Sequence, residues 1–405
     1  MHVRHVAGAA AVAVTVLTGP FAAGALTSHG GHGQASHRFN ASGRPFLSTG
    51  SGRIASVSCR STTSCTAVGS ASGRAASALS WNGTGWTLDT MPKPPHPAGL
   101  DAVSCADATD CVAVGSYEYQ YNQYPFAEQL SGTTWRVLPN PPAIANASGD
   151  IMGVACSSPT SCVAVGEDGA TESGSGSQMP YAAEWNGTSW QQSALPIPPG
   201  YKNPTGILSS VSCESATDCT AVGFFGTGYN PGTVALAEHW NGTTWSLKKV
   251  PLPTTSADAN LTAVSCVPAG CEAVGYLVAK STGRELGYST SWNGTAWTAD
   301  KLTYAPHGSI SPELYGITCT STTSCVAVGN SGHSGPQGAD RLLIEAFNGT
   351  SWSVPKAPQP NESELHSVAC SAVGSCTAVG DTFGGGFNHL ALGLKGGTWA
   401  IEKTP

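Results

Sequence analysis

The sequence predicts an all-β fold: a seven-bladed β-propeller of four-stranded antiparallel blades with one disulfide in each blade. Three observations predict it. One unit recurs seven times, with first cysteines 46 to 57 residues apart; a second cysteine and x-Ala-Val-Gly follow each time; and all 11 tryptophans fall on repeat positions. Repeats of this length bury a core by stacking on their neighbours, and units of four short strands are typical of propeller blades.

Each unit divides into four expected strands. The first is an apolar stretch that ends at the first cysteine, as in residues 56–59, and the second runs from the other cysteine through Ala-Val-Gly, as in residues 65–69. An alternating run such as residues 235–240 predicts the third strand, and a run such as residues 245–250 predicts the fourth. We expect the strands to run from the centre of the ring outward in chain order. No strand is left over for a blade shared by both ends, so ring closure should rest on packing between blades one and seven, helped by residues 45–47.

The dipeptide Asn-Gly lies between the third and fourth strands of most units. It predicts a tight hairpin turn whose two central residues both have positive φ. The Asn-Gly-Thr triplets are also acceptor sequences for N-glycosylation, but they stand where the hairpin geometry needs them, and we favour the turn interpretation. The turns are expected at Asn82, Asn186, Asn241, Asn293 and Asn348.

The 14 cysteines predict a disulfide framework, because an even number at a repeating spacing is typical of secreted proteins. A zinc site is not favoured, since the spacing C-x5-C is poor for zinc and no paired histidine follows. We expect no metal and no cofactor. Seven local pairs follow from the repeat: Cys59 with Cys65, Cys105 with Cys111, Cys156 with Cys162, Cys213 with Cys219, Cys266 with Cys271, Cys319 with Cys325, and Cys370 with Cys376.

The amino-terminal segment has the plan of a secretory signal: Arg4 near the start, an apolar run over residues 6–17, and small residues before position 26. We therefore expect a secreted, extracellular protein. The expected parts are a signal peptide at 1–25, a flexible linker rich in Ser, Gly and His at 26–50, and a propeller at 51–405. Its blades are expected at about 54–100, 101–150, 151–206, 207–258, 259–312, 313–362 and 363–405.

The charge pattern limits the classes of binding partner that the protein can have. Only 11% of the residues are charged, the formal net charge is −7, and no basic block occurs. A nucleic-acid surface needs a stripe of Lys and Arg, so no nucleic-acid partner is expected. No second apolar run is long enough to span a membrane. We expect a monomer.

The repeat resembles that of Kelch-like propellers of the galactose-oxidase type, in which a second strand ending in Gly-Gly precedes a tryptophan. Here the second strand ends in Val-Gly, as at Val222-Gly223, and cysteines flank the first turn. The resemblance implies a seven-bladed ring. Copper-radical oxidases of that kind need a free cysteine bonded to tyrosine, and the repeat pairs every cysteine of this chain.

Propeller geometry places the turns after the first and third strands on one face, where they are nearly uniform. The loops after the second strand and between blades lie on the other face, which we call the variable face. Variable loops on a rigid scaffold commonly carry function, and tyrosines beside Gly, Asn and Gln suit recognition. We predict a binding scaffold for a glycan or protein. The candidate ligand-binding residues are Tyr119, Tyr121, Tyr124, Phe126, Phe224, Phe225, Tyr229, Tyr276, Phe383 and Phe387.

The alternative is a carbohydrate-active hydrolase or lyase that uses carboxylates near the axis. Acidic residues occur in two places, and those of the third strands are expected to share one repeat position and to be structural. No catalytic residue is assigned. The acids of the variable loops are Glu118, Glu167, Asp168, Glu172 and Asp381; those of the third strands are Glu128, Glu184, Glu238 and Glu345.

Overall fold

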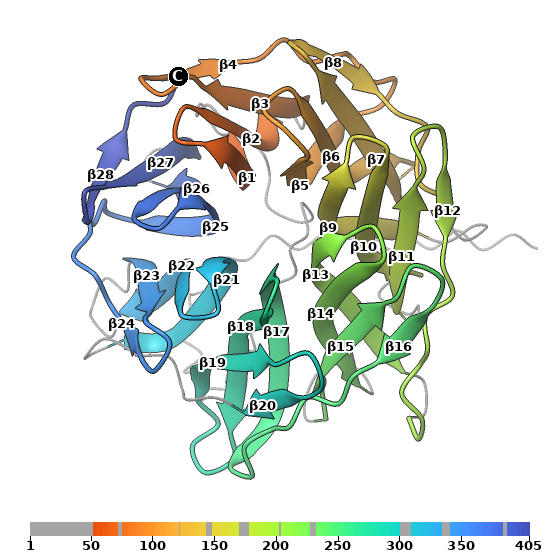
Figure 1. The fold of residues 1–405 in the computed structure, drawn as a ribbon, viewed down its shortest axis with the longest axis vertical. Coiled ribbons are helices and arrows are strands. Elements are labelled where there is room, and N and C mark those ends of the chain that lie inside the picture. Colours follow the sequence, from red (N-terminus) through yellow and green to blue (C-terminus); the bar gives the residue numbers. More distant parts are fainter. Residues whose placement is uncertain are drawn as a thin grey trace, which may run out of the picture. The chain divides into compact units, whose positions relative to one another are not determined.

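The computed structural model of the protein describes residues 52–71, 75–120, 122–142, 148–169, 178–201, 204–226, 232–299, 309–333, 341–383 and 387–405. These residues form β-strands and contain no helix. The strands make seven antiparallel sheets, each built from four strands that follow one another in the chain. Figure 1 shows the first strand of each blade nearest the axis and the fourth at the rim. The predicted fold class is confirmed.

Each blade contains four consecutive strands. Blade one has β1 (Arg53–Ser61), β2 (Ser64–Ala71), β3 (Ala75–Trp81) and β4 (Trp86–Leu88); blade two has β5 (Ala98–Cys105), β6 (Asp110–Tyr119), β7 (Asn122–Ser131) and β8 (Thr134–Val137). Blade three has β9 (Gly149–Ser158), β10 (Ser161–Asp168), β11 (Met179–Trp185) and β12 (Trp190–Gln192); blade four has β13 (Thr205–Ser215), β14 (Asp218–Gly226), β15 (Val234–Trp240) and β16 (Trp245–Leu247). Blade five has β17 (Ser256–Val267), β18 (Gly270–Ala279), β19 (Glu285–Trp292) and β20 (Trp297–Ala299); blade six has β21 (Ser309–Ser321), β22 (Ser324–His333), β23 (Arg341–Phe347) and β24 (Trp352–Ser353). Blade seven has β25 (Ser363–Ala372), β26 (Ser375–Thr382), β27 (Asn388–Lys395) and β28 (Thr398–Glu402).

The core lies between the blades. On each first strand, an Ile or Leu lies three residues before the Val or Ile that stands two residues before the first cysteine. This residue, Leu208 in blade four, has no more than 1% of its surface exposed. The Ala and Val of each Ala-Val-Gly triplet are also fully buried, and each core cluster joins side chains of two neighbouring blades. Burial of apolar surface contributes about 25 cal/mol per Å², so each blade is stabilised mainly by its neighbours.

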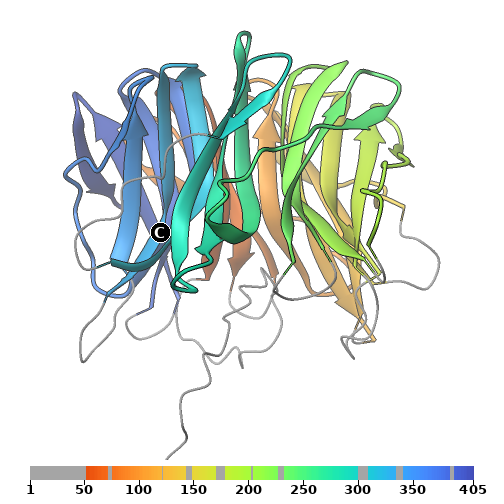
Figure 2. The ribbon, with the colours of Figure 1, turned by 90° about the horizontal axis from the view of Figure 1, so that it is seen from below.

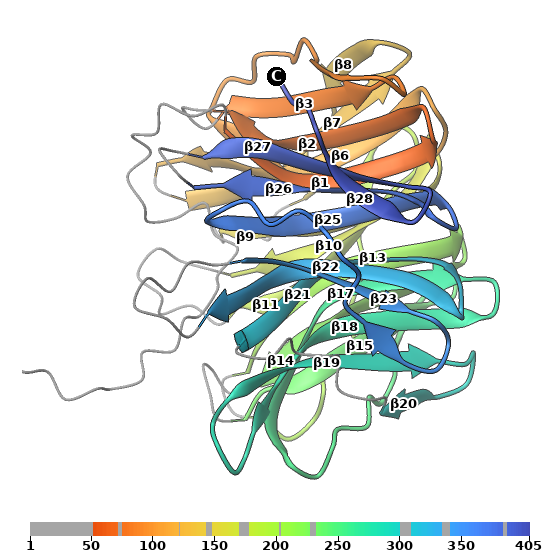
Figure 3. The same ribbon diagram turned by 90° about the vertical axis from the view of Figure 1, so that its left-hand side faces the viewer.

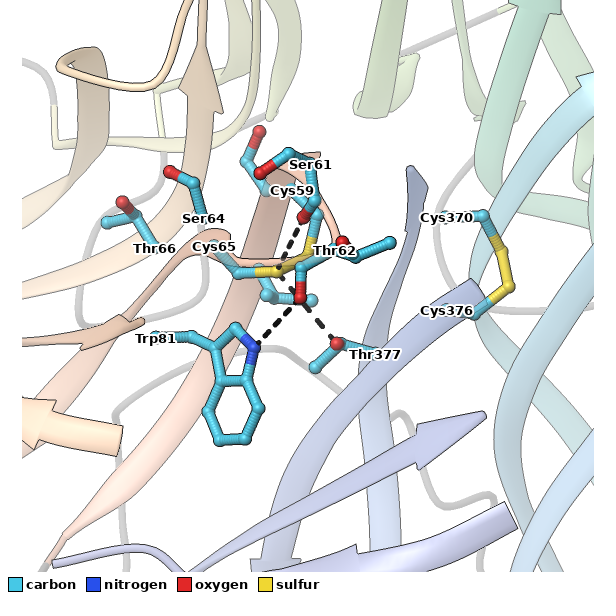
Figure 4. Close-up of a disulfide and its surroundings, with 12 residues drawn as sticks. Cys59, Ser61, Thr62, Ser64, Cys65, Thr66, Trp81, Cys370, Cys376 and Thr377 are labelled. Atoms are coloured by element: carbon cyan, nitrogen blue, oxygen red, sulfur yellow. Dashed lines mark hydrogen bonds between the residues drawn. A yellow bond between two sulfur atoms is a disulfide. The ribbon is translucent and has the colours of Figure 1, made fainter. Parts of the chain in front are cut away.

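The seven predicted disulfides are all present, and the described residues contain no free cysteine. Each bridge joins two residues that stand opposite each other, as Cys59 and Cys65 do on β1 and β2. The hydroxyl of Thr377 in blade seven lies 3.9 Å from Cys65 Sγ (Figure 4). Such a framework is typical of an oxidising extracellular or periplasmic compartment.

Serines of the first strands connect the blades. The hydroxyl oxygens of Ser56 and Ser58 accept hydrogen bonds from the backbone N–H groups of Val103 and Cys105 in the next blade. The same bond recurs at other seams, for example from Cys266 to Ser212. An edge strand leaves backbone groups unpaired. The repeated Ser-Val-Ser-Cys pattern thus supplies acceptors for the inner edge of the neighbouring sheet.

Blades one and seven close the ring through the same type of contact. Val57 N donates to Ser367 Oγ at 3.2 Å, and Trp86 Nε1 donates to Glu402 Oε2 at 3.0 Å. Figure 3 shows β25, β26 and β27 beside blade one, and Ile54 packs in one core cluster with residues of blade seven. Among the described strands, none is exchanged between these two blades. Residues 45–47, the predicted signal peptide and the predicted linker lie outside the described residues.

The Asn-Gly turns differ from the prediction. Four residues separate the flanking tryptophans, and only the glycine has positive φ, as at Gly242 (φ 90°). Asn241 Oδ1 instead accepts hydrogen bonds from Thr243 N, Thr243 Oγ1 and Thr244 N at 3.0, 2.8 and 2.9 Å. The asparagine side chain therefore replaces the backbone pairing of a two-residue hairpin, which is an alternative that Asn commonly takes.

Candidate functional site

The uniform face offers little that distinguishes one blade from another. Figure 2 shows its short turns together along one edge of the ring. A Cβ added to Gly242 would lie 2.5 Å from Thr217 Cγ2, so the Asn-Gly turn and the disulfide-bridged turn of one blade pack against each other. Blades one, three and six repeat this contact at Gly83, Gly187 and Gly349. The blade-specific residues lie at the other ends of the strands.

Two of the predicted binding residues belong to the core. Phe126 is 2% exposed and Phe225 is fully buried, each within a core cluster between blades. Their rings have no surface for a ligand, which corrects the prediction for these two. The cause is that successive side chains of a strand point to opposite faces of the sheet. On β7 and β14 this alternation points Phe126 and Phe225 into the interface with a neighbouring blade. Tyr121 and Tyr229 lie outside the described residues.

Blade two carries an aromatic cluster on the variable face, formed by His96, Tyr117, Tyr119 and Tyr124. The Tyr117 ring stacks on Tyr124 with centroids 5.3 Å apart, and His96 lies 5.5 Å from Tyr117 and 4.7 Å from Tyr119. Tyr119 is 44% exposed. The prediction included Tyr119 and Tyr124. It did not include Tyr117 of β6 or His96, which precedes β5 in the blade link and carries no repeat signal.

The other predicted aromatics lie at separate places around the ring. Phe383 and Phe387 contact each other edge to face at 5.3 Å, and the Arg53 guanidinium lies 5.2 Å from the Phe387 centroid. Phe224 and Tyr276 are half-buried near the axis on the second strands of blades four and five. The structure therefore does not gather the ten candidates into one patch.

A belt of paired residues surrounds the axis near the variable face. It consists of the residue after each Ala-Val-Gly triplet and its partner on the first strand. A β-bulge follows on every first strand, and a bulge re-aims the extra side chain. The pairs are Arg53–Ser70, Gly99–Ser116, Asp150–Glu167, Ile207–Phe224, Asn260–Tyr276, Glu313–Asn330 and Glu364–Asp381; the bulge residues are Ala55, Asp101, Met152, Ser209, Thr262, Tyr315 and His366. We call these residues the axial belt.

The axial belt is acidic at blades two and three. Asp150 and Glu167 are 5% and 6% exposed. Burial, then the charges of Asp101 and Glu167, raise the pKa of Asp150 well above its ordinary value. Asp101 has solvent-accessible surface, but protein surrounds it inside the ring. The resulting desolvation raises the pKa of Asp101 to about 6, and the positive charge of Arg53 partly opposes this rise. Desolvation penalises the charged form of a carboxyl group.

At the seam of blades seven and one the acids are paired. Asp381 is fully buried and accepts hydrogen bonds from Arg53 Nε at 3.2 Å and Ile54 N at 3.0 Å, while His366 Nε2 lies 3.0 Å away. Glu364 Oε1 lies 3.5 Å from Arg53 Nη2 and 3.3 Å from His366 Nε2. Glu364, His366 and Asp381 are close enough to hold a metal ion, but Arg53 already supplies a positive charge to both carboxylates. The arrangement is that of a charge network that closes the ring.

The predicted positions of the other acidic residues agree with the structure only in part. Four of the predicted loop acids lie on second strands instead, and Glu172 is outside the described residues; the four are Glu118, Glu167, Asp168 and Asp381. Glu128, Glu238 and Glu345 share one register position and are fully buried. Glu184 is one position later, so it faces the other side of its sheet. Burial raises the pKa of Glu128 to about 7 and that of Glu238 to about 8. None of these three buried side chains reaches the variable face.

Comparison with known proteins identifies the fold alone. No protein-family model and no curated protein matches the sequence. The chain is similar to the solved structure of YCF48 from Cyanidioschyzon merolae, at 12% identity and a TM-score of 0.51, covering 86% of this chain and 97% of that one. It is also similar to a GH74 xyloglucanase from Xanthomonas campestris (12% identity, TM-score 0.53, 88% of this chain and 55% of that one).

A third similar structure is a PL25 ulvan lyase bound to an oligosaccharide (7% identity, TM-score 0.54, 84% of this chain and 92% of that one). These likenesses agree with the propeller part of the predicted resemblance; the Kelch-like assignment itself stays a prediction. The described part of the chain also holds no helix of the length and apolarity that crossing a membrane requires.

Proposed function

We propose that the protein is a secreted, non-catalytic binding scaffold that holds a glycan or protein ligand on the variable face. The observation that carries this proposal is the aromatic cluster of blade two, in which Tyr119 is 44% exposed beside His96 and Tyr117. Tyrosine rings offer a large contact area and a polar tip at a small cost in conformational entropy.

The geometry of the acids favours binding over the alternative of a hydrolase or lyase. Glycosidases need two carboxyl groups that both reach the scissile bond. In the axial belt Asp381 is fully buried and Asp150 and Glu167 are almost fully buried, whereas Asp101 is exposed. Propellers with either kind of activity share this fold, so the distinction rests on these side chains rather than on the architecture.

The test uses the full chain with its disulfides intact on glycan and peptide arrays. Tyr119→Ala is expected to weaken binding about tenfold, because a central aromatic anchor commonly contributes more than 1 kcal/mol. The matched control is Val373→Ala, which removes an apolar side chain that is 74% exposed on the disulfide-bridged turn of blade seven. Equal loss in both variants, or loss in the control alone, would place the ligand elsewhere. Release of sugar fragments from a bound glycan would favour the enzyme.

A further inference from the structure

The seam that closes the ring carries a partly exposed cation. Arg53 begins β1, and its side chain is 35% exposed although Nε lies 3.2 Å from Asp381 Oδ2 and Nη2 lies 3.5 Å from Glu364 Oε1. A guanidinium group has five N–H donors. The hydrogen bonds and ion pairs of Arg53 with described residues use Nε and Nη2. The N–H groups of Nη1 are therefore available to a bound molecule.

Glu364 provides an acceptor beside this donor, and its side chain is 15% exposed. Its Oε1 atom lies 3.5 Å from Arg53 Nη2 and 3.3 Å from His366 Nε2, and Oε2 accepts a hydrogen bond from Asn330 Nδ2 at 3.4 Å. A carboxylate has about four acceptor positions, so these three contacts leave Oε2 able to accept one more hydrogen bond. Arg53 and Glu364 thus present a charged donor and a charged acceptor side by side.

Two phenylalanine rings lie next to this pair. Phe383 and Phe387 flank the loop between β26 and β27, and each keeps part of its surface exposed. Their rings meet edge to face with centroids 5.3 Å apart, and the Arg53 guanidinium carbon lies 5.2 Å from the Phe387 centroid. Gly52 N donates to Phe387 O at 3.3 Å, which holds the end of the loop against blade one. The polar pair therefore has an apolar surface beside it on the variable face.

The charges at this seam distinguish between classes of ligand. One guanidinium group faces the two carboxylates of Glu364 and Asp381, so a sulfate or a uronate is repelled, and the Arg53 charge opposes a bound ammonium group. A neutral hydroxyl group both donates and accepts hydrogen bonds. Two adjacent hydroxyls of a sugar can therefore accept from Arg53 Nη1 and donate to Glu364 Oε2. The C–H groups of the same sugar ring can pack on the phenylalanine rings, whose faces carry partial negative charge.

We propose that Arg53, Glu364 and Phe387 form a subsite for one neutral sugar residue that has two adjacent hydroxyl groups. This inference rests on the proposed function, because it assigns a glycan as the ligand and adds a second contact region on the variable face. The subsite lies at one seam of blade one, and the aromatic cluster with Tyr117 packs at the other. The contacts of Arg53 and Glu364 are in place without a ligand, so binding costs little side-chain entropy.

The experiment uses the full chain with its disulfides intact on an array of neutral, sulfated, uronate-bearing and amine-bearing oligosaccharides. Neutral glycans are expected to bind, and the strongest of them is then compared by calorimetry with its mono-deoxy analogues. Loss of either of two adjacent hydroxyls is expected to weaken binding about tenfold or more, because a site built for a hydroxyl disfavours an analogue that lacks it. Loss of any other hydroxyl should have a smaller effect.

Two variants test whether this preference comes from the closing seam. Phe387→Leu removes the ring, leaves the ion pairs of Arg53, and should weaken binding of the neutral glycan about tenfold. Its control is Phe224→Leu, which makes the same change at a half-buried ring of the axial belt in blade four. Glu364→Gln keeps the shape of the side chain and should reduce the penalty for one deoxy analogue, since the hydrogen bond is no longer charge-assisted. Thermal unfolding of every variant separates loss of binding from loss of the fold.

The outcomes distinguish the two proposals. Binding of charged glycans only, equal affinity for all deoxy analogues, unchanged affinity in Phe387→Leu, or an equal loss in Phe224→Leu would overturn the sugar subsite. If a peptide or a glycan then binds and Tyr119→Ala weakens it, the proposed function stands without the subsite. If neither a glycan nor a peptide binds, both proposals fall.

Discussion

Glu238 provides a direct test of how the buried acids affect stability. Its side chain is fully buried on β15, neither carboxyl oxygen has a hydrogen-bond partner among the described residues, and burial raises its pKa to about 8. The unfolded chain ionises near the ordinary value of 4.5. Folding therefore favours the protonated form. Below pH 4.5 Glu238 is protonated in both states and does not lower the free energy of unfolding. As the pH rises through 8, the folded state is increasingly penalised, and this stability is lost.

The magnitude follows from the size of the shift. One pKa unit corresponds to about 1.4 kcal/mol, so a shift from 4.5 to about 8 gives a ceiling of about 5 kcal/mol. Local relaxation lowers the actual cost, and we expect about 1–3 kcal/mol at pH 8.5. Glu238→Gln keeps the shape and cannot ionise. It should therefore raise stability by about that amount at pH 8.5 and leave it nearly unchanged at pH 4.5.

The assay is thermal unfolding under non-reducing conditions at both pH values, in which a gain of this size raises Tm by about 2–4 °C for a domain of this length. Glu214→Gln is the control, because it removes the same charge from an exposed position on the disulfide-bridged turn of blade four. An equal gain at both pH values, or a gain in the control as large as in Glu238→Gln, would refute the reasoning.

Three other changes test the scaffold. Replacing Cys213 and Cys219 together by alanine should cost about 2 kcal/mol, because the closed loop is short, and should leave the circular dichroism of the ring intact; unfolding of the whole chain would contradict local bracing of each blade. Asp381→Asn should cost about 2–4 kcal/mol in urea unfolding, since it removes the charge that Arg53 binds at the closing seam; a cost below about 0.5 kcal/mol would show that closure does not depend on it. Gly242→Ala should destabilise more than Gly396→Ala in the same measurement, because both glycines have positive φ but only Gly242 is in close contact with a neighbouring turn; equal effects would contradict that packing.

The local features of the fold were predictable because they depend on residues close together in the chain. The cysteine spacing fixes each bridge within one hairpin, as for Cys59 and Cys65. The alternation of apolar residues and the Ala-Val-Gly triplets mark the strands. Antiparallel order then places the turns after the first and third strands on one face and the loops after the second strand on the other. The Asn-Gly turn was predicted in place but not in geometry, because the Asn241 side chain competes with the backbone for the same donors.

The axial belt was not predictable, because it depends on bulges and on contacts between distant blades. A bulge shifts the alternation by one residue, so the direction of Asp101 or His366 does not follow from the sequence pattern. Arg53 and Asp381 are 328 residues apart, and only ring closure brings them together. The burial of Phe126 and Phe225 was decided in the same way, by which side of a strand meets the next blade.

The sequence by itself determined the repeat, the disulfides, the strand order and the two faces, since each follows from local spacing. Only the tertiary structure decided which acids are paired, which aromatics remain exposed, and which carboxyl groups are buried near the axis. The physical reason is that a repeat records what every blade has in common, whereas the candidate site is built from the positions at which the blades differ.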